Sequence, residues 1–268
     1  MQKCTNTLRI LLVAGLSLFA FSATVQASNE HITAKLGYVN FKNLPNGNGE
    51  INPIRLQALR ETATQLGATG ALAWQSLQIN RTLEEQADYL NHVFDFNQLL
   101  LNHNVLPPVL VESDGSLNQD SDDALRLASK TYMIESQAKF VTTPPNWRNY
   151  LWMNYGRPDM PSRSLLPTTK DEAAAWNTFL DEGWQHGITQ ANEIFKVNIS
   201  RLKRDYKGMV LYRKLLAQRM VSAPFVAQTN LGVTGDSKHI RINDQVLRIT
   251  AHSELQTDSN KWNPVLAK

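Results

Sequence analysis

The residues best suited to acid–base or metal chemistry are scattered along this chain of 268 residues. No two histidines have the i, i+4 spacing that places two imidazoles on one face of a helix, and none belongs to an HExxH motif. Asp120, Asp122 and Asp123 have the charge for calcium, but they lack the loop glycine and the distal glutamate of an EF-hand. The pattern therefore predicts no metal site. The histidines are His31, His92, His103, His186, His239 and His252.

Two pairs of adjacent carboxylates also fail to predict an active site. Glycosidases need two carboxyl groups that face each other, usually from separate elements. Glu84-Glu85 instead belongs to a capping-box pattern, and Asp181-Glu182 to the polar face of an expected helix. The sequence contains no GxSxG, GxxxxGK[ST] or GxGxxG motif. We therefore expect no catalytic residue and no cofactor, and predict that the chain is not an enzyme.

An aromatic stretch, Phe140–Tyr155, is the most distinctive part of the sequence. Thr143 can cap a helix whose first position is Pro144. The stretch then supplies large rings at close to helical spacing. Such rings either anchor a core or form a surface for a partner or for stacking against glycans, and both alternatives stay open. The candidate partner-contact residues are Trp147, Tyr150, Trp152 and Tyr155.

Residues 1–27 have the pattern of a secretory signal peptide. Lys3 and Arg9 precede or flank the short apolar run Ile10–Phe21, which is too short for a membrane anchor. Small residues before the junction predict cleavage between Ala27 and Ser28. We expect an exported, periplasmic protein, soluble or peripherally attached to the outer membrane, that begins with a flexible arm over residues 28–51.

The single cysteine limits both redox chemistry and lipid attachment. Cys4 lies in the predicted signal peptide, so the mature chain has no thiol for a disulfide, a metal or a nucleophile. The acceptor cysteine of a bacterial lipoprotein follows the apolar run, and Ser28 stands there instead. We expect no acyl anchor.

The charge balance argues against a general affinity for polyanions. Without Lys3 and Arg9, 25 basic and 24 acidic residues remain, a net charge of about +1. A local basic patch is the exception, because seven basic residues crowd the second half. They are Arg201, Lys203, Arg204, Lys207, Arg213, Lys214 and Arg219.

Capping and turn signals outline the first half of the fold. Asn52-Pro53 predicts a helix start, with Gly67 and Gly70 either breaking the helix or admitting another backbone. Thr82–Glu85 predicts a second helix through a capping box. Leu106–Val111 must be extended around its paired prolines. Asp114-Gly115 predicts a turn, and residues 124–141 predict short strands.

The second half predicts one long helix followed by strands. Thr169 opens the helix, Gly183 and Gly187 mark close packing or a bend, and Lys207-Gly208 marks an interruption. Residues 225–233 are expected to be extended and 232–236 to turn. The segments 239–242 and 245–251 alternate across Asn243-Asp244, which predicts a two-residue hairpin. Residues 252–268 form a polar tail, expected to be loose. The fold class is α+β, a helix-dominated single unit with short strands mid-chain and a C-terminal β-hairpin.

Nine ordered stretches together carry a family likeness. They are Gly70–Trp74 (GALAW), Phe94–Asn97 (FDFN) with Leu106–Leu110 (LPPVL), Thr142–Met153 (TTPPNWRNYLWM), Glu182–Trp184 (EGW), Gly187–Asn192 (GITQAN), Gly208–Ala217 (GMVLYRKLLA), Leu231–Asp236 (LGVTGD) and Val246–Ala251 (VLRITA). In this order the chain resembles the DotC family of type IVB secretion systems. The conjugation branch of that family, on IncI-type plasmids, includes TraI proteins unrelated to the relaxase of the same name. The resemblance covers residues 52–251, the expected DotC-like domain.

The resemblance implies a structural subunit of the outer-membrane core complex of a conjugative type IVB secretion system. Such proteins work with a DotD-like lipoprotein and a DotH-like core protein to place and assemble the channel ring. Members of the family are typically lipoproteins, and this chain departs from them because it has no lipobox cysteine. Retention at the outer membrane is then expected to come from partners.

Two other readings stay open. A periplasmic peptidoglycan-binding or hydrolytic protein would use Trp147, Trp152 and Tyr155 as a stacking platform. Direct binding of the transferred DNA through Arg201–Lys207 would be salt-sensitive, and the near-zero net charge makes nucleic-acid binding the least favoured reading.

Overall fold

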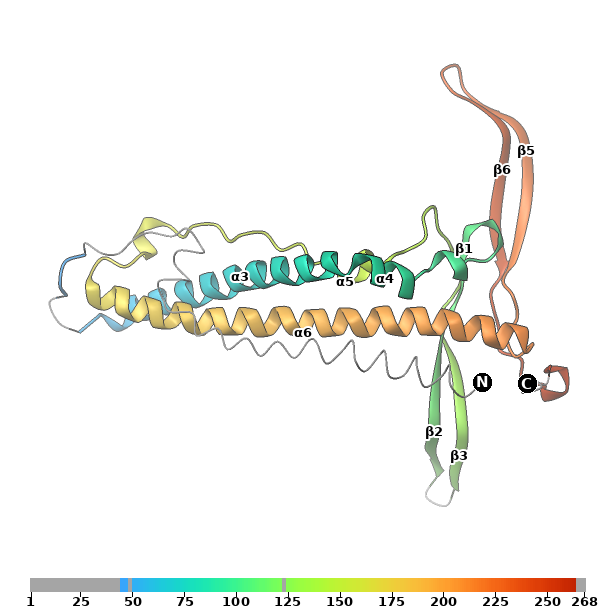
Figure 1. Ribbon diagram of the computed structural model, residues 1–268, viewed down its shortest axis with the longest axis horizontal. Helices are drawn as coiled ribbons and strands as arrows, with labels where there is room; N and C mark the ends of the chain where they lie inside the picture. The colour runs from blue at the N-terminus through green and yellow to red at the C-terminus, as the bar shows by residue number, and fades with distance from the viewer. Residues whose placement is uncertain (1–43, 48–49, 122–123, 264–268) are drawn as a thin grey trace. The chain divides into compact units, whose positions relative to one another are not determined.

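The computed structural model describes residues 44–47, 50–121 and 124–263, and its mixture of helices and two-stranded sheets confirms the predicted α+β class (Figure 1). The predicted signal peptide, the Ala27–Ser28 junction and most of the expected arm lie outside these ranges. The elements in chain order are α3 (Pro53–Glu85), α4 (Ala87–Val93), η1 (Asn97–Leu99), η2 (Asn102–Asn104), β1 (Val105–Leu106), β2 (Val109–Ser121), β3 (Ala124–Ser136), β4 (Lys139–Phe140), α5 (Trp147–Leu151), η3 (Arg163–Leu165), α6 (Lys170–Ala217), β5 (Phe225–Gly235), β6 (Ile240–Ala251) and η4 (Ser259–Lys261).

Contacts divide the described residues more finely than the single unit expected from the sequence. The first unit contains residues 44–70 and 158–185, and the second contains residues 71–157 and 186–263. α3 and α6 each contribute their N-terminal part to the first unit and the remainder to the second.

The start of α3 follows the local signal in the sequence. The Asn52 side chain accepts a hydrogen bond from the Ile54 backbone N–H at 2.9 Å, and Pro53 takes the first helical position. The predicted capping box at Thr82–Glu85 is wrong, because α3 continues to Glu85. Thr82 Oγ1 instead donates to the Gln78 carbonyl at 3.1 Å within the helix, so its hydroxyl bonds backward rather than capping a new start.

Two glycines hold the helices of the first unit close together. A Cβ on Gly67 would lie 2.3 Å from the Leu180 carbonyl oxygen, and one on Gly183 would lie 2.2 Å from the Thr64 carbonyl oxygen. Neither position has room for a methyl group. The sequence predicted either a helix break or a close approach of another backbone at Gly67. α3 continues through Gly67, so the close approach is the alternative that the structure confirms.

One ion pair anchors the start of α6 in the same unit. Glu172 is buried, and the Arg55 guanidinium contacts its two carboxylate oxygens at 3.1 and 3.2 Å. The Thr168 backbone N–H donates to the same carboxylate at 2.8 Å. The Arg55 side chain beside Glu172 holds the pKa of that carboxyl below its usual range. The predicted opening of α6 by Thr169 is confirmed, since Thr169 Oγ1 accepts from the Glu172 N–H at 3.3 Å.

The core of the second unit gathers apolar side chains from helices and from the β1 region. Its largest member is Trp147, and Phe96, Leu202 and Met209 are also buried in it. β1 and β4 form a small antiparallel sheet with Val105 opposite Phe140. The Gly208 position on α6 packs on the start of β2, where an added Cβ would lie 2.7 Å from the Leu110 carbonyl oxygen. The predicted interruption at Lys207-Gly208 is therefore wrong: the glycine permits packing and the helix continues.

β2 and β3 form a long antiparallel hairpin. The predicted extended segment 106–111 and the strands in 124–141 are confirmed by β1, β2, β3 and β4. The predicted turn at Asp114-Gly115 is wrong, because β2 runs through both residues with Asp114 opposite Lys130. Gly115 has a φ of +66° inside the strand. Glycine therefore permits a local irregularity in the backbone of β2 here and does not form a turn.

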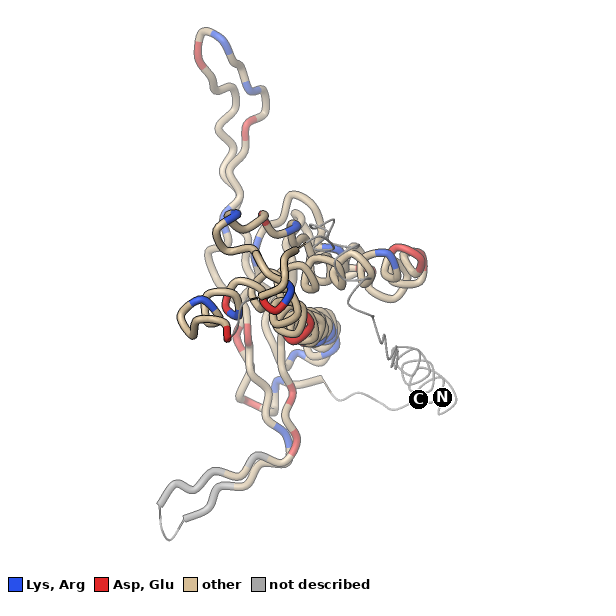
Figure 2. The backbone as a smooth tube through the Cα atoms, turned by 90° about the vertical axis from the view of Figure 1, so that its left-hand side faces the viewer, with Lys and Arg blue, Asp and Glu red and all other residues tan. Residues whose placement is uncertain are grey.

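β5 and β6 form the C-terminal hairpin, but not where the sequence placed it. The predicted two-residue turn at Asn243-Asp244 is wrong, since both residues lie inside β6 and the chain reverses between Gly235 and Ile240. Asn243 has a φ of +58° and is the extra residue between the pairs Gly232↔Asp244 and Val233↔Ile242, which is a β-bulge. A left-handed Asn suits either a hairpin turn or a bulge, so the dipeptide alone could not separate them. Figure 2 shows β5 in tan along its length, because the strand contains no charged residue.

Residues 252–263 were expected to be loose, and the structure shows them bonded back to the end of α6. Gln256 N–H donates to the Met220 carbonyl at 2.8 Å, and Asn263 N–H donates to the Gln218 carbonyl at 2.8 Å. Ser253 is buried, and Val221 bridges to Leu255. Polar composition predicted a solvated tail, but backbone hydrogen bonds hold this segment in place.

Candidate partner-contact site

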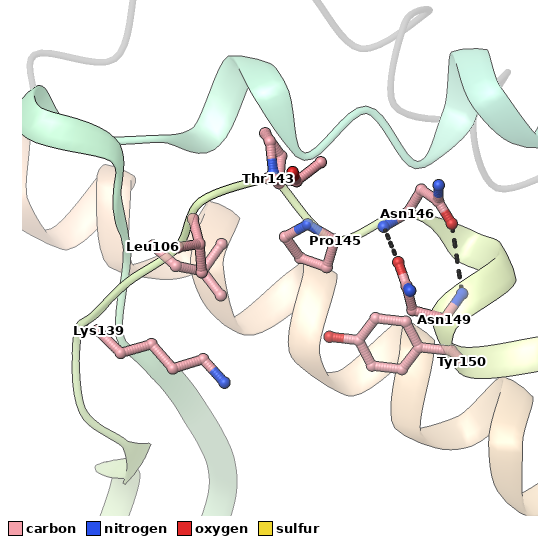
Figure 3. Close-up of a pocket in the computed structure, with 9 residues that line it drawn as sticks. Leu106, Lys139, Thr143, Pro145, Asn146, Asn149 and Tyr150 are labelled. Carbon is pink, nitrogen blue, oxygen red and sulfur yellow. Dashed lines mark hydrogen bonds between the residues drawn. The ribbon is translucent and has the colours of Figure 1, made fainter. Parts of the chain in front are cut away.

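α5 is shorter than the aromatic spacing predicted, and it begins three residues later than Pro144. Its N-cap is Asn146, which exchanges two hydrogen bonds with Asn149: Asn149 N–H to Asn146 Oδ1 at 3.3 Å and Asn146 N–H to Asn149 Oδ1 at 2.8 Å (Figure 3). The helix ends at Leu151. The helix starts later than predicted because its N-cap is Asn146 and not Thr143. The Asn146 side chain bonds the free backbone N–H of the first turn that Thr143 was expected to bond.

Trp147 is a core residue. Its side chain is fully buried, and its indole Nε1–H donates to Asn91 Oδ1 at 2.8 Å. The Arg148 guanidinium lies 4.3 Å from the Trp147 ring centroid and bonds Glu84 at 2.9 Å. The structure therefore places this tryptophan where it stabilises the second unit, away from any surface platform.

Tyr150 lies half-buried at the edge of the same core. Its ring stacks on Phe96 at 5.8 Å with an interplanar angle of 5°, and the Arg201 guanidinium lies 5.1 Å from its centroid. Burial, with the negative charge of Asp205 as the second cause, raises the pKa of Tyr150 to about 12. The hydroxyl thus stays protonated at physiological pH and serves as a hydrogen-bond donor.

Trp152 and Tyr155 are the two predicted contact residues that the structure leaves on the surface. Trp152 is 46% exposed and Tyr155 is 38% exposed. The backbone beside Trp152 is held in place, because Asn80 accepts from the Met153 N–H at 3.1 Å and donates to the Met153 carbonyl at 2.6 Å. An exposed indole on an anchored backbone is ready for a partner at little cost in conformational entropy.

A cavity of about 320 Å³ lies beside α5. In Figure 3 the side chains of Lys139 and Tyr150 extend toward the same space from opposite sides. The Lys139 ammonium forms no ion pair with any residue that the structure describes. No local pattern in the sequence marks this residue, because the β1–β4 pairing brings it to α5. The other lining residues are Leu106, Val141, Thr143, Pro144, Pro145, Asn146 and Asn149.

The C-terminal hairpin carries a second exposed surface, which the sequence did not predict. Strand register places Val233, Ile240 and Ile242 on one face, and their exposed fractions are 63%, 71% and 71%. The alternation of apolar residues in the sequence predicts strands with one buried face. In the structure, neither face of this hairpin is deeply buried.

The described residues contain neither a metal-binding cluster nor a membrane-spanning helix. Within them, no group of three or more His, Cys, Asp and Glu side chains could hold a metal ion. No helix in the same ranges combines the length and apolar character needed to cross a membrane. One residue of each acidic pair has a basic partner: Glu84 bonds Arg148, and Glu182 lies 3.9 Å from Arg60.

The match to a protein family is continuous over both units. A family model described as "Type IV secretory system, conjugal DNA-protein transfer" matches residues 53–264. The chain belongs to this family. The match begins at the first residue of α3 and extends past η4, so the conjugal-transfer family includes both hairpins and the segment that bonds back to α6. No curated protein matches the chain.

Proposed function

We propose that this member of the conjugal-transfer family is a structural subunit, not an enzyme, of the outer-membrane core complex of a type IVB secretion system. The observation that carries the proposal is the family match over residues 53–264. The ordered stretches that resemble the DotC family, Thr142–Met153 and Gly208–Ala217 among them, supply the finer assignment. In this role the chain helps to place and assemble the channel ring.

The surfaces of the second unit support an assembly role. Trp152, Tyr155 and the apolar face of β5–β6 expose large side chains to water. Exposed apolar patches of this kind mark protein–protein or membrane interaction sites. The open edge of β5 has no charge to discourage pairing with another strand.

The proposed partners are a DotD-like lipoprotein and a DotH-like core protein. Because Ser28 stands where a lipoprotein needs cysteine, we propose that the chain reaches the periplasm through its signal peptide and is held at the outer membrane by these partners. It has no acyl chain of its own in this scheme.

Deletion of the gene tests the role. Transfer frequency and the amount of DotH-like protein in the outer-membrane fraction should both fall to background, and the intact gene should restore both. Fractionation of the chain itself, with and without the rest of the transfer system, should find it at the outer membrane only when its partners are present. Normal transfer by the deletion strain would overturn the proposal.

A second candidate function, peptidoglycan binding, is favoured by the exposed rings of Trp152 and Tyr155. It predicts binding to soluble peptidoglycan fragments that Trp152→Ala weakens. Tyr89→Ala is the matched control, because Tyr89 is 52% exposed and lies on α4. Equal binding by both variants, or no binding, would exclude a stacking role for Trp152.

A further inference from the structure

The strand β5 has one strand partner and one free edge. Within the described residues, β5 and β6 form a two-stranded sheet, and no other strand pairs with either of them (Figure 1). Every second residue of an antiparallel edge strand directs its backbone N–H and C=O away from its partner. A single two-stranded hairpin is only marginally stable in water, so further strand pairing at a free edge stabilises it.

The regular part of β5 is short and uncharged. Register shifts follow Phe225 and Asn230, and between them Val226–Asn230 pairs continuously with Gln245–Ile249 of β6. We name Val226–Asn230 the β5 segment. Its sequence, VAQTN, contains no charged residue, proline or glycine, and its last three residues are exposed. Charges, prolines and bulges are the features by which edge strands avoid pairing with other chains, and the β5 segment has none of them between its ends.

The two strands of the hairpin differ in charge. β6 contains Arg241, Asp244 and Arg248, whereas β5 contains no charged residue. If the regular part of β6 paired with its own copy in antiparallel register, Leu247 would lie on the axis and the two Arg248 residues would be diagonal neighbours, roughly 7–8 Å apart. Like charges at that separation repel each other. Pairing between two copies is therefore favoured at the edge of β5 and disfavoured at the edge of β6.

We propose that the β5 segment pairs in antiparallel register with the β5 segment of a second copy of this chain. Pairing over the whole segment places its midpoint, Gln228, opposite Gln228 of the second copy. The contact is isologous, because each copy supplies the same surface. The result is a four-stranded sheet with the two uncharged β5 strands in the centre and the charged β6 strands at the edges, where native sheets place charge.

The side chains of the β5 segment suit pairing with an identical strand. In this register Ala227 lies opposite Thr229, and no charged residue faces another. The amide of Gln228 both donates and accepts hydrogen bonds, so two copies of it can satisfy each other. In the structure Gln228 Nε2 donates to Gln245 Oε1 at 2.9 Å. Gln228 Oε1 is then the acceptor for the amide of the second copy. The biological meaning of the contact rests on the proposed function, which it deepens by naming a surface through which copies join.

Charges introduced at the axis test the contact by sedimentation of the purified chain. Gln228→Lys and Gln228→Glu should each self-associate at least about tenfold more weakly than the unmodified chain, because like charges then face each other across the axis. An equimolar mixture of the two variants should recover association, since opposite charges then face each other. The matched control is Gln245→Lys, which loses the same hydrogen bond to Gln228 but places its charge on β6. It should associate as the unmodified chain does.

A disulfide between copies tests the register directly. The only cysteine of the chain is Cys4, so in a Cys4→Ser background an introduced cysteine is the single thiol. Residues directly opposite each other in an antiparallel pair have Cα atoms about 4.5–5.5 Å apart, within the range that a disulfide spans. Gln228→Cys should therefore form a covalent dimer on mild oxidation, and Gln245→Cys should not.

Circular dichroism melting of every variant checks that it folds. A chain that stays monomeric at all concentrations, a mixture that shows no recovery, or equal cross-linking of Gln228→Cys and Gln245→Cys would overturn the inference. So would a Gln228→Cys chain that cross-links in cells to a different protein and not to its own copy.

The inference and the proposed function can fail separately. If deletion of the gene abolishes transfer but Gln228→Lys associates and transfers normally, the function stands and the β5 contact is wrong. If the variants at Gln228 behave as expected while the deletion strain transfers normally, the contact is real and the proposed function is wrong.

Discussion

The helix contact of the first unit and the β5–β6 hairpin of the second use their residues in opposite ways. At the contact, Gly67 and Gly183 bring backbones so close that an added Cβ would lie 2.3 and 2.2 Å from a carbonyl oxygen. On the hairpin, Ile240 and Ile242 are each 71% exposed. The glycines lie where two backbones are closely packed, and the large apolar side chains lie on a surface exposed to solvent.

This difference separates stability from recognition. Close packing gains dispersion energy from many atom pairs and tolerates almost no change in volume. An exposed apolar side chain contributes little to folding, because its area stays in water until something covers it. We therefore expect substitutions at the helix contact to act on the free energy of unfolding, and substitutions on the hairpin to act on assembly.

The largest expected effect is that of Gly183→Val. The nearest atoms belong to the Thr64 backbone, which cannot rotate away, so the free energy of unfolding should fall by roughly 3 kcal/mol or more. Urea denaturation measures it. Gly156→Val is the matched control, because nothing lies within 4 Å of a Cβ built there. An equal loss in both variants would mean that the helices of the first unit are not held by this approach.

A smaller loss is expected for Glu172→Gln. The variant removes the charge that Arg55 contacts at 3.1 Å and weakens the hydrogen bonds from Thr168, so we expect a loss of about 2 kcal/mol in the free energy of unfolding. Glu182→Gln is the control, because its pair with Arg60 is exposed and 3.9 Å long. Similar losses in the two variants would contradict a special role for Glu172.

The same carboxylate makes the effect depend on pH. Because the pKa of Glu172 is lower in the folded state than its ordinary value of 4.5, its stabilisation is fully present above that value and is lost as the pH falls through the folded pKa. The difference in Tm between the chain and Glu172→Gln should therefore be largest near neutral pH and shrink below about pH 4. Thermal melts across this range measure it, and a difference that grows in acid would contradict the sign.

The smallest effect on folding is expected for Val233→Thr. The side chain is 63% exposed on β5, so stability should change by less than about 0.5 kcal/mol. The same substitution at Val105, which is fully buried, should cost roughly 1–3 kcal/mol because the hydroxyl enters an apolar core. If Val233→Thr also leaves transfer frequency unchanged, the exposed face of the hairpin is not a contact surface.

Local signals in the sequence were sufficient to predict structure where a side chain acts on the backbone of nearby residues. Asn52 with Pro53 and Thr169 with Glu172 mark the starts of α3 and α6 correctly, because capping depends on residues within three positions. The paired prolines after Leu106 likewise excluded helix by their own geometry. The family likeness, read from ordered stretches along the chain, is confirmed at the level of the conjugal-transfer family.

The same residue types misled where tertiary contacts decided their use. Gly208 reads as a helix break, but it lies where β2 packs on α6. Asn243 reads as a hairpin turn, but it forms a bulge inside β6. Trp147 and Trp152 stand five residues apart with similar neighbours, and one is fully buried while the other is 46% exposed. No pattern within the stretch separates them.

The sequence by itself determined the helix starts, the extended segment around the prolines, the charge of each segment and the family. Only the tertiary structure decided which glycines admit a backbone and which aromatic rings remain on the surface. The physical reason is the sequence separation over which each interaction acts. Caps, proline and charge act within a few residues, whereas burial and close approach depend on segments far apart in the chain.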